Sequence, residues 1–318
     1  MGVAILIDEP RWPAHGTVFG HLVSDSSLDE LHDFAARAGL PSRAFDHDHY
    51  DIPVSRYDDL VAAGALAVGE RELVRRLAAS GLRVRRPDKS PTRAEARPAA
   101  LADWDRYGLP VDVRDDLLAR WAEPHRHYHD VRHLVACLSA LDALGAGRTR
   151  AAVSRRDRVA AVSEPDGASI DPTIRVLRLA AWFHDAVYDG VPGRDEEASA
   201  RLAEDVLYGL IPAREAAEVA RLVRMTADHR PADDAAAQLS DADLSVLGQI
   251  PGRYHVYARD VRLDYAHLDD DTWRRGRLAV VESLLGADPL FHTAAGRRLW
   301  SETARANLAA ERKRLVGI

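Results

Sequence analysis

The chain has 318 residues, about twice the size of a common single domain, which favours two domains. Hydrophobic residues make up 47% and charged residues 29%, a composition that excludes general disorder. No apolar run reaches the roughly 18 residues of a membrane span. The single cysteine, Cys137, excludes an internal disulfide framework, and the net charge of −7 disfavours nucleic acid as a partner. We therefore expect a cytoplasmic protein that acts on a small molecule, with no membrane partner.

Residues 1–86 alternate strand-like and helix-like segments, as in a small α/β domain. Ser27 and Glu30 have the spacing of a capping box, which predicts the start of a helix. We expect strands at 3–7, 18–23, 65–68 and 82–84, and helices at 27–39, 53–64 and 70–79.

Residues 87–100 contain three prolines and mixed charge without apolar periodicity, which is typical of a linker. Beyond it, helical periodicity predicts an all-α domain over residues 101–318. The expected helices are 113–122, 129–144, 174–188, 195–209, 213–229, 240–248, 252–267, 271–286 and 297–314. The polar stretch 146–172 is expected to be a long connection or a lid. The predicted fold class is therefore multidomain: a small α/β domain at 1–86, then an all-α domain.

Histidines recur in the sequence HRHYHDVRH, which begins at position 125. His125, His129 and His133 are spaced every fourth residue, so on a helix they would share one face and could converge on a metal ion. The alternative for His125 and His127 is a surface position.

Two further apolar stretches of the same domain contain residue types that can bind a metal ion. His184 and Asp185 follow the run LAAWF, where burying them is costly unless they are paired or bound to a cation. Asp241 and Asp243 interrupt another apolar segment, LSDADLSVLG, although either could serve as a helix N-cap.

The order His133, His184-Asp185, Asp243 resembles that of the HD superfamily of metal-dependent phosphohydrolases. Residues 101–315 resemble bacterial proteins described as predicted metal-dependent HD-superfamily phosphohydrolases, which implies that the all-α domain is HD-domain-like. The supporting stretches are EPHRHYHDVRHL, AWFHDAVYD, EEASARLA, TADHR, DADLSVLG, YHVYARDVRLDYAH and ARANLAAE. The resemblance implies hydrolysis of a phosphate ester, with nucleotides as the expected substrate class. The alternative is a nucleotide-sensing regulatory protein with a weakly active or inactive HD domain.

The resemblance also implies which residues bind the metal. His133, His184, Asp185 and Asp243 would hold a divalent ion, with Asp241 as the competitor for the last position. Two imidazoles and two carboxylates suit Mn²⁺, Co²⁺, Fe²⁺ or Mg²⁺.

Two residues are expected to take part in catalysis. YHDVRH is similar to the YHNxxH stretch of cyclic-nucleotide phosphodiesterases, which implies His129 as a general acid, although Asp130 replaces the asparagine. Asp185 would orient the attacking water as well as bind the ion. Tyr188 stands where some nucleotidases of the superfamily carry a glutamate.

Three residues are expected to contact substrate. Arg126 and Arg277 are candidate phosphate clamps, because guanidinium matches phosphate oxygens bidentately. His229 is a candidate to bind phosphate or to hydrogen-bond a metal ligand. The alternative is a surface histidine at a helix end.

The first domain resembles a small uncharacterised bacterial domain family through IDEPRWPAHG, HLVSD and FDHDHYD, and no activity follows from this resemblance. Polar residues at its strand ends could form a second site, where α/β folds place ligands. The alternative is that they lie in solvated turns. These residues are Asp8, His15, His21, His47, His49 and Asp51.

Overall fold

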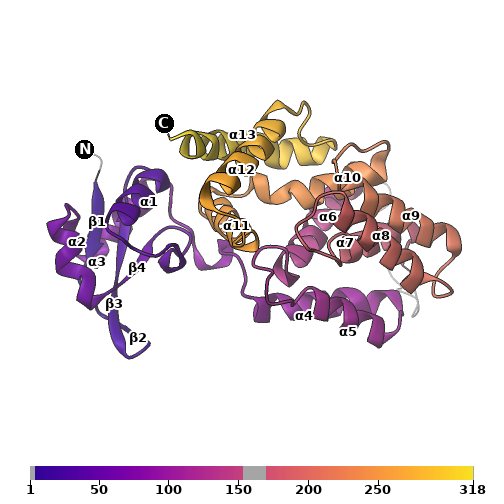
Figure 1. The fold of residues 1–318 in the computed structure, drawn as a ribbon, viewed down its shortest axis with the longest axis horizontal. Helices are drawn as coiled ribbons and strands as arrows, with labels where there is room; N and C mark the ends of the chain where they lie inside the picture. Colours follow the sequence, from indigo (N-terminus) through magenta and orange to yellow (C-terminus); the bar gives the residue numbers. More distant parts are fainter. Residues whose placement is uncertain (1–3, 153–169, 318) are drawn as a thin grey trace. The chain divides into compact units, whose positions relative to one another are not determined.

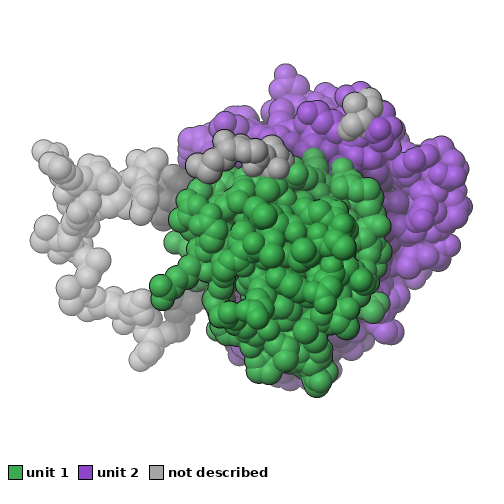
Figure 2. All heavy atoms as spheres, turned by 90° about the vertical axis from the view of Figure 1, so that its left-hand side faces the viewer, with its two compact units in different colours: residues 1–90, 250–259 green, residues 91–249, 260–318 purple. Residues whose placement is uncertain are grey.

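The computed structural model describes residues 4–152 and 170–317, which divide into two compact units (Figure 2). The first unit, called the sheet unit below, comprises Met1–Ser90 and Ile250–Arg259. The second, called the helical unit, comprises Pro91–Gln249 and Asp260–Ile318. The expected combination of a small α/β region and a helical remainder is confirmed, whereas the HD fold stays a prediction.

The sheet unit is built on a five-stranded mixed sheet. Its strands are β1 (Ile5–Asp8), β2 (Trp12–Ala14), β3 (Thr17–Ser24), β4 (Tyr50–Pro53) and β5 (Leu66–Val68). The long strand β3 pairs antiparallel with β1, β2 and β4, whereas β5 pairs parallel with β1. The strand predicted at 82–84 does not form, because Val84 donates its backbone N–H to the carboxylate of Asp48, at 2.6 Å, and not to a neighbouring strand.

Helices α1 (Leu28–Arg37), α2 (Tyr57–Ala62) and α3 (Glu70–Ala79) complete the sheet unit (Figure 1). Helix α1 begins as predicted, with the Ser27 side chain accepting the N–H of Glu30. One face of the sheet packs against α1 and α2, and the other packs against Leu73 and Leu77 of α3. The remaining short 3₁₀ turns are 42–44, 54–56 and 86–88.

The expected linker and domain boundary need correction. Thr92 and Glu95 form a complete capping box, so helix α4 (Arg93–Trp104) begins inside the segment predicted to be a linker. Ile250–Arg259 belongs to the sheet unit, where Val256 is part of the hydrophobic core and His255 stacks on His32 with ring centroids 4.8 Å apart. The sheet unit is therefore made of two separate pieces of chain.

The helical unit surrounds one central helix, α7 (Pro172–Phe183), which is buried from Val176 to Phe183. A helix buried on all its faces must be covered by neighbours on every side, and α7 packs against α6, α8, α9 and α10. The other helices that follow α4 are α5 (Val111–Arg120), α6 (Val131–Ala152), α8 (Arg194–Leu207), α9 (Ala213–Met225), α10 (Asp234–Asp243), α11 (Pro251–Asp264), α12 (Asp270–Gly286) and α13 (Ala294–Val316). Only the end of α11, from Asp260 on, belongs to the helical unit. Short 3₁₀ turns lie at 105–107 and 244–248.

The stretch 146–172, expected to be a connection or lid, falls mostly outside the described residues. Helix α6 extends to Ala152 and helix α7 begins at Pro172, so both ends of the stretch are helical. Within the described part of the chain, no helix combines the length and the apolar character needed to cross a membrane.

Candidate metal centre

Three helix ends meet at one point in the helical unit. His133 lies in the first turn of α6, His184 is the C-cap residue of α7 with Asp185 directly after it, and Asp243 is the last residue of α10. These helices pack against one another, so side chains far apart in the sequence come together. Helices α7 and α10 direct their C-terminal, electronegative ends toward this point, which favours a cation there.

The predicted metal ligands are within a few ångströms of one another. The Nε2 atoms of His133 and His184 are 3.1 Å apart. Asp243 Oδ1 lies 3.0 Å from Nε2 of His133 and 3.6 Å from Nε2 of His184. Asp185 Oδ2 lies 3.1 Å from Nε2 of His184 and 3.6 Å from Nε2 of His133. The structure thus brings all four residues to one centre.

This centre is buried, and its charges depend on one another. The imidazoles are almost fully buried, whereas the side chains of Asp185 and Asp243 are 17% and 15% exposed. Burial by itself lowers the pKa of His184, but the charges of Asp185 and Asp243 outweigh burial and raise it well above 6.5. In return, although burial opposes ionisation, the imidazoles hold the pKa of both carboxyl groups below the usual range.

The donor set fits a divalent metal ion. Nδ1 of His184 lies 2.9 Å from the carbonyl oxygen of Ala181. Because a carbonyl can only accept, Nδ1 carries a proton and Nε2 is the nitrogen that faces the centre, where it could bind a metal ion in place of its second proton. Two imidazole nitrogens and two carboxylates buried together would otherwise repel or need protons, so a bound cation relieves the cost of their burial.

Cys137 joins this centre and was missed in the sequence analysis. It follows His133 by one helical turn, and its Sγ lies 3.7 Å from Nε2 and 3.8 Å from Nδ1 of that residue. The nearly equal distances place the sulfur against the ring of His133 and not directly ahead of Nε2. The spacing of four residues from His133 is the signal that could have identified it.

His229 also lies at the edge of the centre. Its Nε2 is 3.5 Å from Oδ2 of Asp243, and its Nδ1 is 3.1 Å from the hydroxyl of Ser240. The residue follows α9 in a left-handed conformation, with φ of 52°, which turns the chain toward α10. Its expected position beside the metal ligands therefore agrees with the geometry.

The two competing aspartates have different environments. The carboxylate of Asp241 accepts the backbone N–H groups of His292 and Thr293, at 2.7 and 2.8 Å, together with the hydroxyl of Thr293. Asp241 therefore fixes the turn that precedes α13, whereas Asp243 is the aspartate that lies beside His133 and His184. Sequence alone left this choice open, because both residues are in the last turn of α10.

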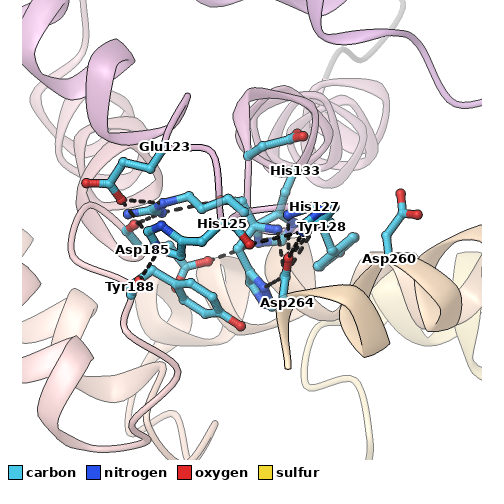
Figure 3. A network of polar contacts seen from close by, with 12 residues as sticks. Glu123, His125, His127, Tyr128, His133, Asp185, Tyr188, Asp260 and Asp264 are labelled. Carbon is cyan, nitrogen blue, oxygen red and sulfur yellow. Dashed lines mark hydrogen bonds and ion pairs between the residues drawn. The ribbon is translucent and has the colours of Figure 1, made fainter. Parts of the chain in front are cut away.

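A histidine–aspartate pair, His129 and Asp264, lies next to the centre, and the rings of His129 and His133 have centroids 5.7 Å apart. Figure 3 shows Asp264 beside His127 and Tyr128. Nδ1 of His129 lies 2.7 Å from Oδ2 of Asp264, and the His129 ring stacks on Tyr188 with centroids 4.2 Å apart. Asp264, the last residue of α11, also accepts backbone N–H groups from His127 and Tyr128. These bonds offset the effect of burial and hold the pKa of Asp264 below 3.8. No spacing in the sequence linked Asp264 to His129, although both occur in stretches that carry the family resemblance.

The expectation that three histidines share one helix face is wrong. Helix α6 begins only at Val131, because the side chain of Asp130 accepts the N–H of Arg132 and ends the preceding loop. His129 therefore lies in the loop, and His125, with a half-exposed side chain, contacts the carbonyl of Tyr188. Only His133 of the three is on the helix.

The two arginines predicted to bind phosphate make their contacts within the protein. Arg126 is fully buried and donates to the carbonyls of Asp185 and Ala186 and to Glu123. Arg277 is buried in a bidentate ion pair with Glu311 on α13. Both guanidinium groups are thus occupied, and Arg126 holds the backbone just after α7 in place.

One comparison with known proteins identifies part of the chain. Residues 5–80 match the family described as a protein of unknown function, DUF4031. This match agrees with the expected resemblance of the first domain to an uncharacterised family. No curated protein and no solved structure matches the chain.

Proposed function

We propose that the helical unit is a metal-dependent phosphohydrolase that acts on a phosphate ester, with nucleotides as the expected substrate class. The observation that carries the proposal is the meeting of His133, His184, Asp185 and Asp243 in one buried centre. The family resemblance of residues 101–315 adds the reaction class to this geometry.

The metal ligands of the proposal are the four residues of the centre. A bound divalent ion would activate water as a nucleophile and neutralise charge that develops on phosphoryl oxygens. His133 and His184 would bind it through Nε2, and Asp243 through its carboxylate. Asp185, the more exposed of the two carboxylates at 17%, would also orient the attacking water. Arg126 positions Asp185 by binding its carbonyl oxygen.

His129 is the general acid of the proposal. Asp264 accepts the Nδ1 proton and fixes the ring, which leaves Nε2 as the atom that can pass a proton to the leaving-group oxygen. Stacking on Tyr188 restricts the ring further. A histidine held by a carboxylate on one nitrogen and open on the other is a common arrangement for proton transfer.

The direct test measures phosphate release by the full-length protein on a panel of nucleotides and phosphate esters. We expect release with Mn²⁺ or Co²⁺, loss of release on chelation, and restoration by adding the metal again. His184→Ala is expected to lose both metal and turnover, because the remaining ligands cannot replace it. His267→Gln, which changes an exposed histidine of the same unit, is the matched control.

Two outcomes would contradict the proposal. One is full turnover by His184→Ala. The other is the absence of turnover by metal-loaded protein combined with tight nucleotide binding, which would support the nucleotide-sensing alternative.

A further inference from the structure

The sheet unit gathers polar side chains on a single face of its sheet. In the antiparallel pair of β3 and β4, His21 is directly opposite Asp51. The register of β1 with β3 pairs Ile7 with Leu22, which places Asp8 beside His21. Side chains of a strand alternate between faces, so His49, two residues before Asp51, lies on this same face.

Two aspartates hold the two imidazoles in position. Oδ2 of Asp8 lies 3.1 Å from Nδ1 of His21, and Oδ1 of Asp48 lies 2.6 Å from Nδ1 of His49. Asp8 and Asp48 are buried, so their contacts with the rings are protected from water. Each carboxylate accepts a hydrogen bond from Nδ1, which leaves Nε2 as the ring nitrogen that can bind a metal ion.

The free ligand atoms converge. Nε2 of His49 lies 3.4 Å from Oδ1 of Asp51, and the rings of His21 and His49 have centroids 5.1 Å apart. His21, His49 and Asp51 each offer one ligand atom, a ring nitrogen of each histidine and a carboxylate oxygen of Asp51, and these atoms all lie within 4.8 Å of one another. Three ligand atoms this close to one another can converge on a single metal ion.

A cavity adjoins these residues. It has a volume of about 320 Å³, and its wall includes Asp8, His21 and His49 together with Trp12, Arg83 and Lys89. Two of the three proposed ligands, His21 and His49, thus line a cavity large enough for a small molecule or several waters. A structural metal site is usually closed by a fourth protein ligand, whereas a site that binds substrate keeps a position open.

We propose that His21, His49 and Asp51 bind a divalent transition-metal ion with a coordination position open to this cavity. Two imidazoles and one carboxylate with open positions suit ions such as Fe²⁺, Mn²⁺, Co²⁺ or Zn²⁺. The ligand taken from the cavity side is water or an oxygen atom of a small molecule. The site is independent of the proposed phosphohydrolase centre.

Neighbouring histidines of the sheet unit have other roles and supply controls. His47 binds Asp46 through Nδ1 and accepts the N–H of Ser90 at Nε2, at 2.9 Å. His15 is exposed in the turn between β2 and β3, with φ of 48°. Both were candidates for the second polar site, with a solvated turn as the alternative, and neither is among the three residues whose ligand atoms converge.

The test uses the full-length His184→Ala protein, in which the centre of the helical unit is removed. Titration with Co²⁺, followed by absorption spectroscopy and metal analysis, should show one bound ion per chain. Adding His49→Gln or Asp51→Asn should weaken Co²⁺ binding more than about 100-fold, the upper limit for loss of an outer partner alone. Adding His15→Asn, which suits a left-handed conformation, should leave it unchanged.

Equal Co²⁺ binding with and without Asp51→Asn, in proteins of unchanged circular dichroism, would overturn the proposal. Asp51 is half-exposed, so this substitution is the one least able to disturb folding. If His184→Ala itself does not fold, the wild-type chain is compared with Asp51→Asn, which should bind one ion fewer. Inorganic phosphate should change the spectrum of the bound Co²⁺, and an unchanged spectrum would contradict the open position.

Discussion

The two units collect histidines and aspartates by different means. In the helical unit the side chains come from the ends of three helices and meet in an almost fully buried centre. In the sheet unit they come from the register of neighbouring strands and lie beside a cavity, with the His21 side chain 27% exposed. Helix packing thus joins residues distant in sequence and buries them. Strand pairing joins closer residues and leaves His21 and Asp51 partly exposed, although His49 is buried.

A difference in function between the two units requires the helical centre to be catalytic. His129→Gln should keep its metal but slow phosphate release from an alkyl phosphate ester by about 10²–10⁴-fold, because the general acid is lost. The loss should be smaller for a nitrophenyl phosphate, whose leaving group hardly needs a proton. Steady-state kinetics on both substrates measures the difference, and equal losses would remove His129 from this role.

The second test asks whether the carboxylates behind the sheet-unit histidines matter to metal binding. Asp8→Asn removes the charge that holds Nδ1 of His21, and Co²⁺ affinity at this site should fall by about 10–100-fold. In the helical unit, a backbone carbonyl plays this part for His184. Co²⁺ titration in the His184→Ala background measures the effect, with Asp46→Asn as the matched control. An unchanged affinity would show that Asp8 has no such role.

The third test separates the two aspartates of α10. Asp241→Asn should lower the free energy of unfolding by about 1–3 kcal/mol, because it weakens the charged acceptor of buried N–H groups before α13. Its metal content should not change, whereas Asp243→Asn should lose metal. Chemical denaturation and metal analysis measure these quantities. Loss of metal from Asp241→Asn alone would reverse the assignment.

The smallest expected effect is a pH dependence of stability from Asp264. Hydrogen bonds keep the pKa of Asp264 below its unfolded value of 3.8, so the carboxylate stabilises the fold above that value and less as pH falls. The difference in unfolding free energy between the wild type and Asp264→Asn should be constant above about pH 5 and shrink at lower pH. Denaturation at several pH values measures it, and a difference that grows toward low pH would contradict the sign.

Much of the fold follows from local signals in the sequence. The side chains of Ser27, Asp171 and Thr293 cap the helices that follow them. Apolar periodicity located most helices of the second unit to within about five residues. It missed α4, ended α6 at 144 instead of Ala152, and placed a helix at 240–248 where α10 is Asp234–Asp243. Residues 82–84 were predicted wrongly as a strand, because the long-range bond from Val84 to Asp48 replaces strand pairing.

The candidate site was predictable in its residue types and less so in their roles. His133, His184, Asp185 and Asp243 were recognised by order along the chain. Deciding between Asp241 and Asp243 required knowing that the turn before α13 lies beside α10.

Arginine roles were the least predictable part of the site. The burial of Arg126 and its carbonyl partners depends on how the loop after α7 folds back. Composition offers no information on such partners, and Arg277 was misassigned for the same reason, since Glu311 is distant in sequence.

Helix α11 has a consequence for how the protein can be divided or recombined. Its residues up to Arg259 belong to the sheet unit, and the remainder, with Asp264, belongs to the helical unit. The chain therefore enters the sheet unit twice, and no single cut or gene crossover transfers either unit whole. A fragment of residues 101–318 would expose Val256, which the intact protein buries, and would carry half a helix without its native neighbours. A fusion protein that carries only one of the two units must therefore replace the packing that residues 250–259 provide in the intact chain.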